Sequence, residues 1–208
     1  MNAIYLALDA LFTRYLNQVK AETKQLPSVT FDPPWPSPCD VKQEEQLGND
    51  SQNKNKNKNE NEDEDEKKEN LSYWKPASRI NHALFDDLEQ ALELSFRDDF
   101  KQFYGSFWSN GICVEREDIN FSLIQIWNEE DQEKLKENIL GHAFAKLKSK
   151  QPLNYFIGCT FGDDVICIDH ESGEVVLEKP GRKTHKVLAP SLEAFLLSLS
   201  PTLDEYNG

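Results

Sequence analysis

Apolar residues recur at helical spacing through the first 20 positions of the chain. They stand three or four residues apart, which places side chains on one face of an α-helix, and they are Ile4, Leu8, Leu11, Tyr15 and Val19. This stripe predicts an amphipathic first helix that packs on the core. Five prolines between residues 27 and 38 exclude regular structure there, and Phe31 and Trp35 indicate a loop packed over the domain surface.

A second apolar stripe begins near Asn81 and predicts a second helix. Its members are Leu84, Leu88, Ala91, Leu92 and Phe96. Between Ile112 and Trp127 apolar and polar residues alternate instead. Alternation is the period of half-buried strands, so two strands are expected in this stretch.

The most regular helical pattern follows Asn128, a residue type that caps helices. The first turn carries Glu129, Glu130 and Asp131, and the last turn carries lysines at 146, 148 and 150. Acidic residues at the start and basic residues at the end both stabilise a helix through its dipole. The sequence therefore predicts one long helix after Asn128.

Three strand-like runs occupy residues 155–161, 165–169 and 174–178, separated by short turns that contain Gly162 and Gly173. They predict a three-stranded meander. The basic sequence GRKTHKV at 181–187 is interpreted as a loop, and Ser191 can cap a closing helix over 192–199. The order of elements predicts a single α+β domain, a mostly antiparallel sheet with helices packed against it.

The negative charge belongs mainly to the part of the chain that can fold. The 208 residues carry a formal net charge of −14, and the tract at 48–70 contributes −3 of it, with five Lys against eight Asp and Glu. This tract has no aliphatic or aromatic residue, so it is expected to be a disordered insertion within a single domain spanning 1–208. The remaining net charge of −11 on the rest of the chain repels phosphate backbones and attracts basic protein segments, which argues against nucleic acid as a ligand.

No feature of the sequence directs the chain into a membrane. The N-terminal sequence MNAIYLALDA has no basic n-region, and no apolar run approaches the roughly 18 residues needed to span a bilayer. Cys39, Cys113, Cys159 and Cys167 show no CxxC spacing. We expect a cytoplasmic protein with four reduced, mostly buried cysteines.

Catalytic and metal-binding chemistry find little support in the sequence. Cys159 and Cys167 lie within apolar strand-like runs of an acidic protein, whereas a reactive thiolate needs an exposed electropositive site. His142 shares the helical stripe of Leu135 and Ile139, so it is interpreted as a core histidine. No HxxxH or HxH spacing occurs, and neither a metal nor a cofactor is expected.

Three acidic clusters remain as candidate binding residues. Each is explained equally well as a solvated turn or a helix start. However, connections at one edge of a sheet can lie side by side, and like charges gathered there cost stability that a basic partner would recover. The candidate acidic face comprises Glu115, Glu117, Asp118, Glu129, Glu130, Asp131, Asp163 and Asp164.

Six short motifs occur in order along nearly the whole chain: PSPC (36–39), YWKP (73–76), QIWNEED (125–131), ENILGH (137–142), SGE (172–174) and LEAFLLSL (192–199). In this combination the chain resembles the bacterial Syd family. The resemblance implies an α+β fold related to the SMI1/KNR4 (SUKH) group and no enzymatic activity. The Trp, Gly and His residues among the positions that match the family pattern are expected to be structural. These positions are Trp74, Trp127, Asn138, Gly141, His142, Gly173 and Glu174.

The resemblance also implies a partner. Proteins of this family associate peripherally with the cytoplasmic side of the inner membrane by binding SecY, a subunit of the protein-translocation channel. They are understood to sequester or check excess or misassembled SecY and so to control the translocase negatively. An acidic surface meets basic cytoplasmic loops of SecY, which agrees with the charge of this chain. We expect Glu117, Asp118, Glu129, Glu130 and Asp131 to carry the attraction.

Two other functional classes remain open. Proteins of the SUKH group often neutralise basic nuclease toxins through acidic faces, so an immunity protein is the alternative, and a neighbouring toxin gene would favour it. A cysteine hydrolase would require a thiol with a depressed pKa, which alkylation of the native protein near pH 6 would reveal. Acidic self-repulsion favours a monomer.

Overall fold

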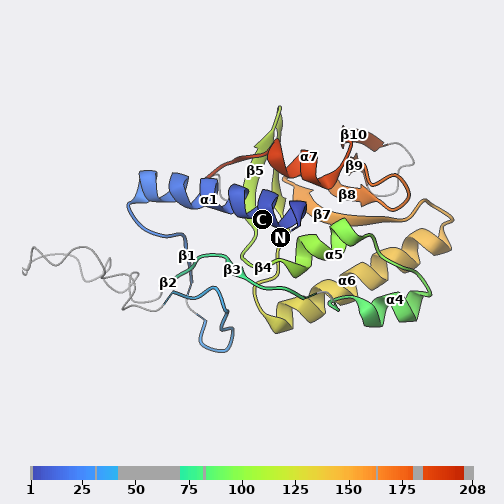
Figure 1. Cartoon of the computed structure of the whole chain (residues 1–208), viewed down its shortest axis with the longest axis horizontal. Coiled ribbons are helices and arrows are strands. Elements are labelled where there is room, and N and C mark those ends of the chain that lie inside the picture. The colour runs from blue at the N-terminus through green and yellow to red at the C-terminus, as the bar shows by residue number, and fades with distance from the viewer. Residues whose placement is uncertain are drawn as a thin grey trace, which may run out of the picture.

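The computed structural model describes residues 2–30, 32–41, 71–81, 83–162, 164–179 and 185–203. Within these ranges the helices are α1 (Ala3–Thr23), α4 (Asp86–Leu92), α5 (Asp98–Gly105), α6 (Glu129–Lys148) and α7 (Leu192–Leu197) (Figure 1). The strands of the main sheet are β5 (Ile112–Arg116), β6 (Ile119–Leu123), β7 (Asn154–Thr160), β8 (Val165–Asp169), β9 (Val175–Glu178), β10 (His185–Ala189) and β11 (Ser200–Pro201). Two short pairs are formed by β1 (Ser28–Thr30) with β2 (Leu71–Tyr73) and by β3 (Ala77–Ser78) with β4 (Phe107–Trp108). The predicted α+β class is confirmed.

The main sheet is antiparallel throughout and strongly curled. Its strand order is β10-β9-β8-β7-β6-β5-β11. Although β9, β8 and β7 lie between them, Lys186 of β10 reaches Glu117 in the β5–β6 turn, with Nζ 3.8 Å from the carboxylate. A flat sheet would keep these residues several strand widths apart. The sheet therefore closes part of the way toward a barrel, and α7 packs on its inner face, where Phe195 stacks on Phe121.

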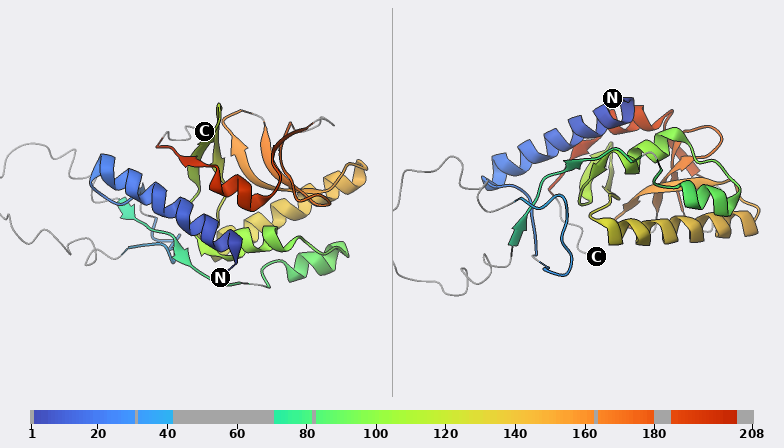
Figure 2. Two further views of the ribbon diagram at one scale, coloured as in Figure 1. Left: turned by 45° about the horizontal axis from the view of Figure 1, so that its top comes forward. Right: turned by 60° about the horizontal axis from the view of Figure 1, so that its bottom comes forward.

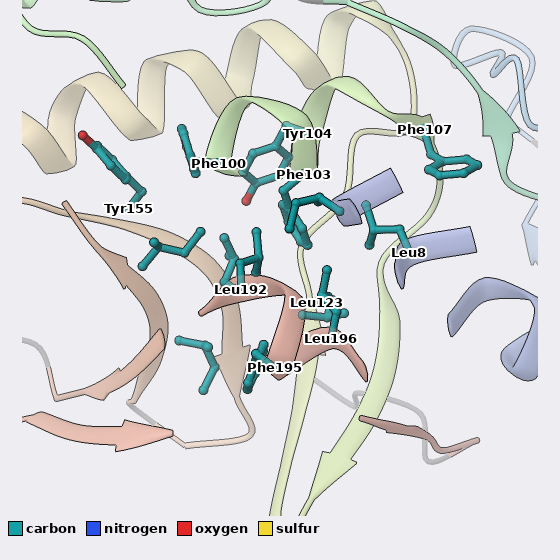
Figure 3. Close-up of a cluster of buried hydrophobic side chains, with 14 of the residues drawn as sticks. Leu8, Phe100, Phe103, Tyr104, Phe107, Leu123, Tyr155, Leu192, Phe195 and Leu196 are labelled. Atoms are coloured by element: carbon teal, nitrogen blue, oxygen red, sulfur yellow. The ribbon is translucent and has the colours of Figure 1, made fainter. Parts of the chain in front are cut away.

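The core lies between this inner face and the helices α1, α5 and α7 (Figure 3). Its centre is aromatic: Tyr155 of β7 stacks on Phe100 of α5, with ring centroids 4.6 Å apart. Side chains from every layer are fully buried in it, and Figure 3 labels Leu8, Phe100, Phe103, Tyr104, Leu123, Tyr155, Leu192, Phe195 and Leu196 among them. One continuous core holds together segments that are far apart in the sequence.

Helix α6 covers the opposite face of the sheet. Neighbouring residues of a strand point to opposite faces, so Phe156 points away from Tyr155 and contacts the ring of His142 on α6. Further along α6, the ammonium of Lys146 donates to the carboxylate of Glu178 on β9, and both side chains are almost wholly buried. Asn154 also donates to Glu178, over 2.5 Å. These contacts fix α6 to the sheet.

Several sequence predictions are confirmed. Helix α1 buries Ile4, Leu8, Leu11 and Val19, as its stripe indicates. Helix α6 begins after Asn128, whose side chain accepts the N–H of Asp131, and α7 begins after Ser191, whose hydroxyl accepts the N–H of Ala194. The two strands after Ile112 and the three-stranded meander are present as β5, β6, β7, β8 and β9.

The predicted second helix is wrong in its extent. The stripe predicts one helix from Asn81 through Phe96, whereas α4 ends at Leu92 and α5 starts only at Asp98. Glu93 adopts a left-handed conformation with φ of 51°, a common way to end a helix. The carboxylate of Glu89 then accepts a hydrogen bond from the N–H of Phe96 over 2.6 Å. A side chain thus pairs with a backbone donor that a continuous helix would have paired with a carbonyl.

The interpretation of the basic sequence at 181–187 as a loop is also wrong in part. Residues 185–189 form β10 and pair with β9 in the register His185↔Glu178. Lys186 and Val187 are exposed and Leu188 and Ala189 are buried, with a register shift between Val187 and Ala189. Pairing satisfies the backbone of β9, which would otherwise be an edge. The predicted insertion at 48–70, together with Phe31, lies outside the described residues.

Candidate binding face

Two of the predicted acidic clusters lie at opposite ends of β6. Glu117 and Asp118 form the turn before β6, whereas Glu129 and Glu130 follow its end in the first turn of α6. Figure 1 shows the β5–β6 hairpin and the start of α6 on opposite sides of the molecule. These residues therefore form two separate acidic surfaces rather than one.

The third cluster lies on the side of the hairpin. Thr160 at the end of β7 pairs with Phe121 of β6, closer to the hairpin turn than the Leu123↔Gly158 pair. Asp164 follows in the β7–β8 connection. The backbone oxygen of Asp164 accepts hydrogen bonds from both the N–H and the hydroxyl of Thr160, at 3.0 Å each. Asp163 lies outside the described residues.

Positive side chains partly neutralise the hairpin surface. Glu117 contacts Arg116 at 3.0 Å and Lys186 at 3.8 Å. Its carboxylate thus links the hairpin to β10 and helps to close the curl of the sheet. Glu115 and Asp118 are exposed beside it. The hairpin therefore has less free negative charge than its composition indicates.

The start of α6 is built by a reciprocal cap. The Asn128 side chain accepts the N–H of Asp131 at 2.9 Å, and the Asp131 carboxylate accepts the N–H of Trp127 at 2.9 Å. Such an exchange satisfies backbone donors that a helix start leaves free. Asp131 consequently holds the helix start in place as well as contributing charge.

The proline-rich loop is attached to this helix start. The Ser37 hydroxyl donates to the backbone oxygen of Trp127 at 2.6 Å, and the Asn128 amide donates to the oxygen of Pro36 at 3.0 Å. The indole N–H of Trp127 points to the oxygen of Trp35, 3.4 Å away. The prediction that the loop packs on the domain is confirmed for its described residues, and the contacts place Trp35 beside Trp127.

Between this loop and the helix start lies a cavity of about 540 Å³, hereafter the acidic pocket. Three carboxylates line it, from Asp32, Asp40 and Asp131, with the side chains of Trp35 and Trp127. Its other lining residues are Val29, Thr30, Ser72 and Asn110, so none of its lining residues is basic. Within the described part of the chain, none of the three carboxylates forms an ion pair, although Asp40 accepts the Ser37 N–H and the Ser72 hydroxyl at 2.9 Å each.

A second cavity, of about 510 Å³, lies on the other side of the proline-rich loop and includes Glu129 and Glu130 in its lining. The Trp35 ring, which lines the acidic pocket, already holds a cation, since the Lys134 ammonium lies 4.0 Å from its centroid. Lys134 also pairs with Glu130 at 3.4 Å. Carboxylates beside an indole ring are the groups that hold a lysine or arginine side chain. The start of α6 is therefore chemically suited to basic segments.

Comparison with known proteins decides the family. The family model described as "Syd protein (SUKH-2)" matches residues 5–201. The chain belongs to the Syd family. Among relatives named Protein Syd, that of Hahella chejuensis is 47% identical over 136 residues, 65% of this chain and 71% of that protein. That of Pseudoalteromonas atlantica is 33% identical over 200 residues, 94% of this chain and 95% of that protein. That of Pseudoalteromonas translucida is 32% identical over 198 residues, 95% of this chain and 98% of that protein.

Several residues that match the Syd pattern have evident structural roles. Trp74 is buried between Tyr15, on which it stacks, and Trp127, which meets it edge-on. His142 is half-buried and bonds through Nε2 to the Asn154 side chain at 2.8 Å. Gly173 has a φ of 76°, and a Cβ there would lie 2.3 Å from the Arg97 guanidinium. This position requires glycine.

The other three Syd-pattern residues have no comparable packing. Glu174 is half-exposed in the turn before β9, where its N–H donates to the Ser172 hydroxyl at 3.2 Å. Asn138 and Gly141 lie on the exposed side of α6. Apart from its own neighbours along the helix, no described atom lies within 4 Å of the position that a Cβ of Gly141 would occupy. The packing of this chain therefore gives no reason for glycine at that position.

The cysteines of this Syd protein are free, and Cys39 and Cys167 are buried. Burial raises the pKa of the thiols of Cys39, Cys159 and Cys167. A raised pKa keeps each thiol protonated at neutral pH, where the thiolate would be the nucleophile. In the described ranges, no group of three or more His, Cys, Asp or Glu side chains can hold a metal ion, and no helix is long and apolar enough to cross a membrane.

Slow alkylation of the cysteines is the expected consequence. Iodoacetamide at pH 7 should modify Cys167 in the native protein at least about tenfold more slowly than in the urea-unfolded protein, because each added pKa unit lowers the thiolate fraction about tenfold. Mass spectrometry of labelled peptides measures both rates. Native labelling of Cys159 or Cys167 at pH 6 that is as fast as in the unfolded protein would contradict this expectation and favour a cysteine hydrolase.

Proposed function

We propose that this protein is a non-enzymatic regulator that binds SecY at the cytoplasmic face of the inner membrane. The Syd resemblance implies the partner, and the acidic pocket supports the mode of binding. Three carboxylates and two indole rings line that pocket, and none of its lining residues is basic. Basic cytoplasmic loops, which membrane channels possess as a rule, supply the complementary charge. Glu129 and Glu130 extend the negative surface beyond the pocket.

The proposed contact combines two kinds of attraction. A lysine or arginine of the loop enters the acidic pocket, where Asp32 and Asp40 neutralise it. Further basic residues pair with the exposed carboxylates of Glu129 and Glu130. Charges at the rim of an interface mainly raise the association rate and fix orientation. Glu115, Glu117, Asp118 and Asp164 form a second acidic surface that is secondary in this proposal.

Regulation follows from competition for the loops. In this proposal the cytoplasmic loops of SecY are covered in a complete translocase and are free in excess or misassembled SecY, the form that the family resemblance implies as the target. An acidic protein that covers free loops therefore binds surplus SecY preferentially. Binding of this kind sequesters the surplus and opposes unproductive translocase assembly.

Co-purification with detergent-solubilised SecY complex tests the proposal. The full chain should be retained at about 50 mM salt and at least tenfold less at about 300 mM, because salt shortens the Debye length and weakens charge pairs. A variant lacking residues 48–70 should behave like the full chain, because the proposed contacts lie in the described domain. Absence of retention at low salt would contradict the proposal and direct the search to a basic toxin.

A further inference from the structure

Helix α6 has an exposed apolar patch that no element of the described chain covers. Phe144 and Leu147 are 53% and 52% exposed, and half-buried Leu140 borders them. Spacings of four and three residues place these side chains on one face of the helix. Figure 2 shows α6 along the outside of the molecule, with this helix at the margin of the right-hand view. Large apolar side chains grouped in this way are typical of a protein contact.

Gly141 lies on the same exposed side and leaves a gap beside the patch. Apart from its own neighbours along the helix, no described atom lies within 4 Å of the position of its missing Cβ. Glycine is the poorest helix former after proline, and this one lies in the middle of a 20-residue helix. Such a gap lets a second backbone or a large side chain approach the helix closely.

Opposite charges flank the apolar patch. Glu137 precedes it and Lys148 follows it, both exposed, and neither forms an ion pair within the described residues. They stand 11 residues apart, which is about 16 Å along a helix. An antiparallel copy of the same helix would bring the negative end of one patch to the positive end of the other.

We propose that α6 pairs with α6 of a second copy of this chain in an antiparallel dimer with two-fold symmetry. The two-fold axis of this dimer passes midway between His142 and Ala143, because that point is the midpoint both of residues 137 and 148 and of residues 141 and 144. In this register Glu137 faces Lys148 of the other copy, and Gly141 faces its Phe144. The symmetry repeats each contact twice. Each Phe144 ring fills the gap over the opposite Gly141, and four charges form two ion pairs.

The dimer leaves the acidic pocket free. The first turn of α6 lies about 13 residues, or about 20 Å, from the centre of the proposed contact. Two acidic pockets would therefore lie at opposite ends of the helix pair. The net charge of −14 opposes association, so the dimer is weak and is best measured near 150 mM salt, where the Debye length is about 8 Å. This inference goes beyond SecY binding and does not depend on it.

Sedimentation equilibrium of the full chain, from about 5 to 500 μM, tests the dimer. We expect a concentration-dependent shift from monomer to dimer that Phe144→Ala weakens at least about tenfold, because two rings are lost at once. The matched control Leu6→Ala removes an equally exposed apolar side chain from α1, 51% exposed, and should leave association unchanged. Gly141→Ala should raise the melting temperature and yet weaken the dimer.

Charge swaps test the register. Glu137→Lys and Lys148→Glu should each weaken self-association, because each places like charges opposite one another. A mixture of the two single variants should form a heterodimer, because both ion pairs are restored, one with reversed signs and one as in the parent protein. A monomer at every concentration, a dimer insensitive to Phe144→Ala, or a mixture without heterodimer would each overturn the proposal. Loss of SecY retention by Phe144→Ala in a monomeric protein would instead assign the patch to SecY.

Discussion

Replacing Lys146 by Met is expected to destabilise the protein by about 3–5 kcal/mol. The Lys146 ammonium and the Glu178 carboxylate form an ion pair between α6 and β9, with side chains only 8% and 10% exposed. Removing the ammonium leaves a buried carboxylate that, among the described residues, keeps a hydrogen bond from the Asn154 amide. An unpaired buried charge costs far more than an exposed one, because it has lost its hydration without gaining a counter-ion.

Urea unfolding of three variants measures this effect. Lys146→Met combined with Glu178→Gln should be more stable than Lys146→Met alone, because no buried charge is left unpaired. Lys186→Met is the matched control, since it breaks an ion pair whose side chains are 61% and 57% exposed and should cost less than about 1 kcal/mol. A Lys146→Met variant within about 1 kcal/mol of the parent protein would show that this pair does not fix α6.

This ion pair matters for function because α6 carries both proposed contacts. Its first turn borders the acidic pocket, and its exposed face carries the apolar patch with Phe144 and Leu147. A binding surface is selective only when the element that carries it is held rigidly. The buried pair near one end of α6 and the Asn128–Asp131 cap at the other supply that rigidity.

Local signals in the sequence predict the elements that surround the site. Asn128 followed by three acidic residues indicates the start of α6, because capping and the helix dipole act within one turn. Helix α1 and the strands β5 to β9 are predicted in the same way, because the spacing of apolar residues is also a local signal. The helix break at Glu93 is not predicted, because it depends on a hydrogen bond from Phe96 to Glu89 that periodicity does not encode.

The acidic pocket itself could not be derived from the sequence. Asp32 and Asp40 flank a proline-rich loop roughly 90 residues before Asp131. Tertiary contacts, such as those of Ser37 with Trp127 and of Pro36 with Asn128, bring the loop to the helix. The sequence shows only which acidic residues are adjacent along the chain. It therefore indicates the β5–β6 turn as a binding surface as readily as the start of α6. It cannot show that Glu117 is paired with Lys186 across the curl of the sheet.

The double variant Glu129→Lys/Glu130→Lys is expected to bind SecY at least about tenfold more weakly than the parent protein. Both residues are exposed beside the acidic pocket, so their reversal places two positive charges where basic loops would approach. Basic residues at a helix start are unfavourable by about 0.3–1 kcal/mol each, which a folded domain of this size tolerates. Retention on solubilised SecY complex at about 50 mM salt gives the affinity, and thermal unfolding confirms that the variant is folded.

The matched control is Glu115→Lys/Asp118→Lys in the β5–β6 hairpin. Both double variants change the net charge from −14 to −10, since each reversal adds two positive units, so any effect of overall charge is the same in both. We expect the hairpin variant to lose less than about threefold in affinity, because short-range contacts at the start of α6 dominate once salt screens the distant charges. Equal losses would mean that SecY senses only the overall charge, and a larger loss in the hairpin variant would move the binding face to the other end of β6.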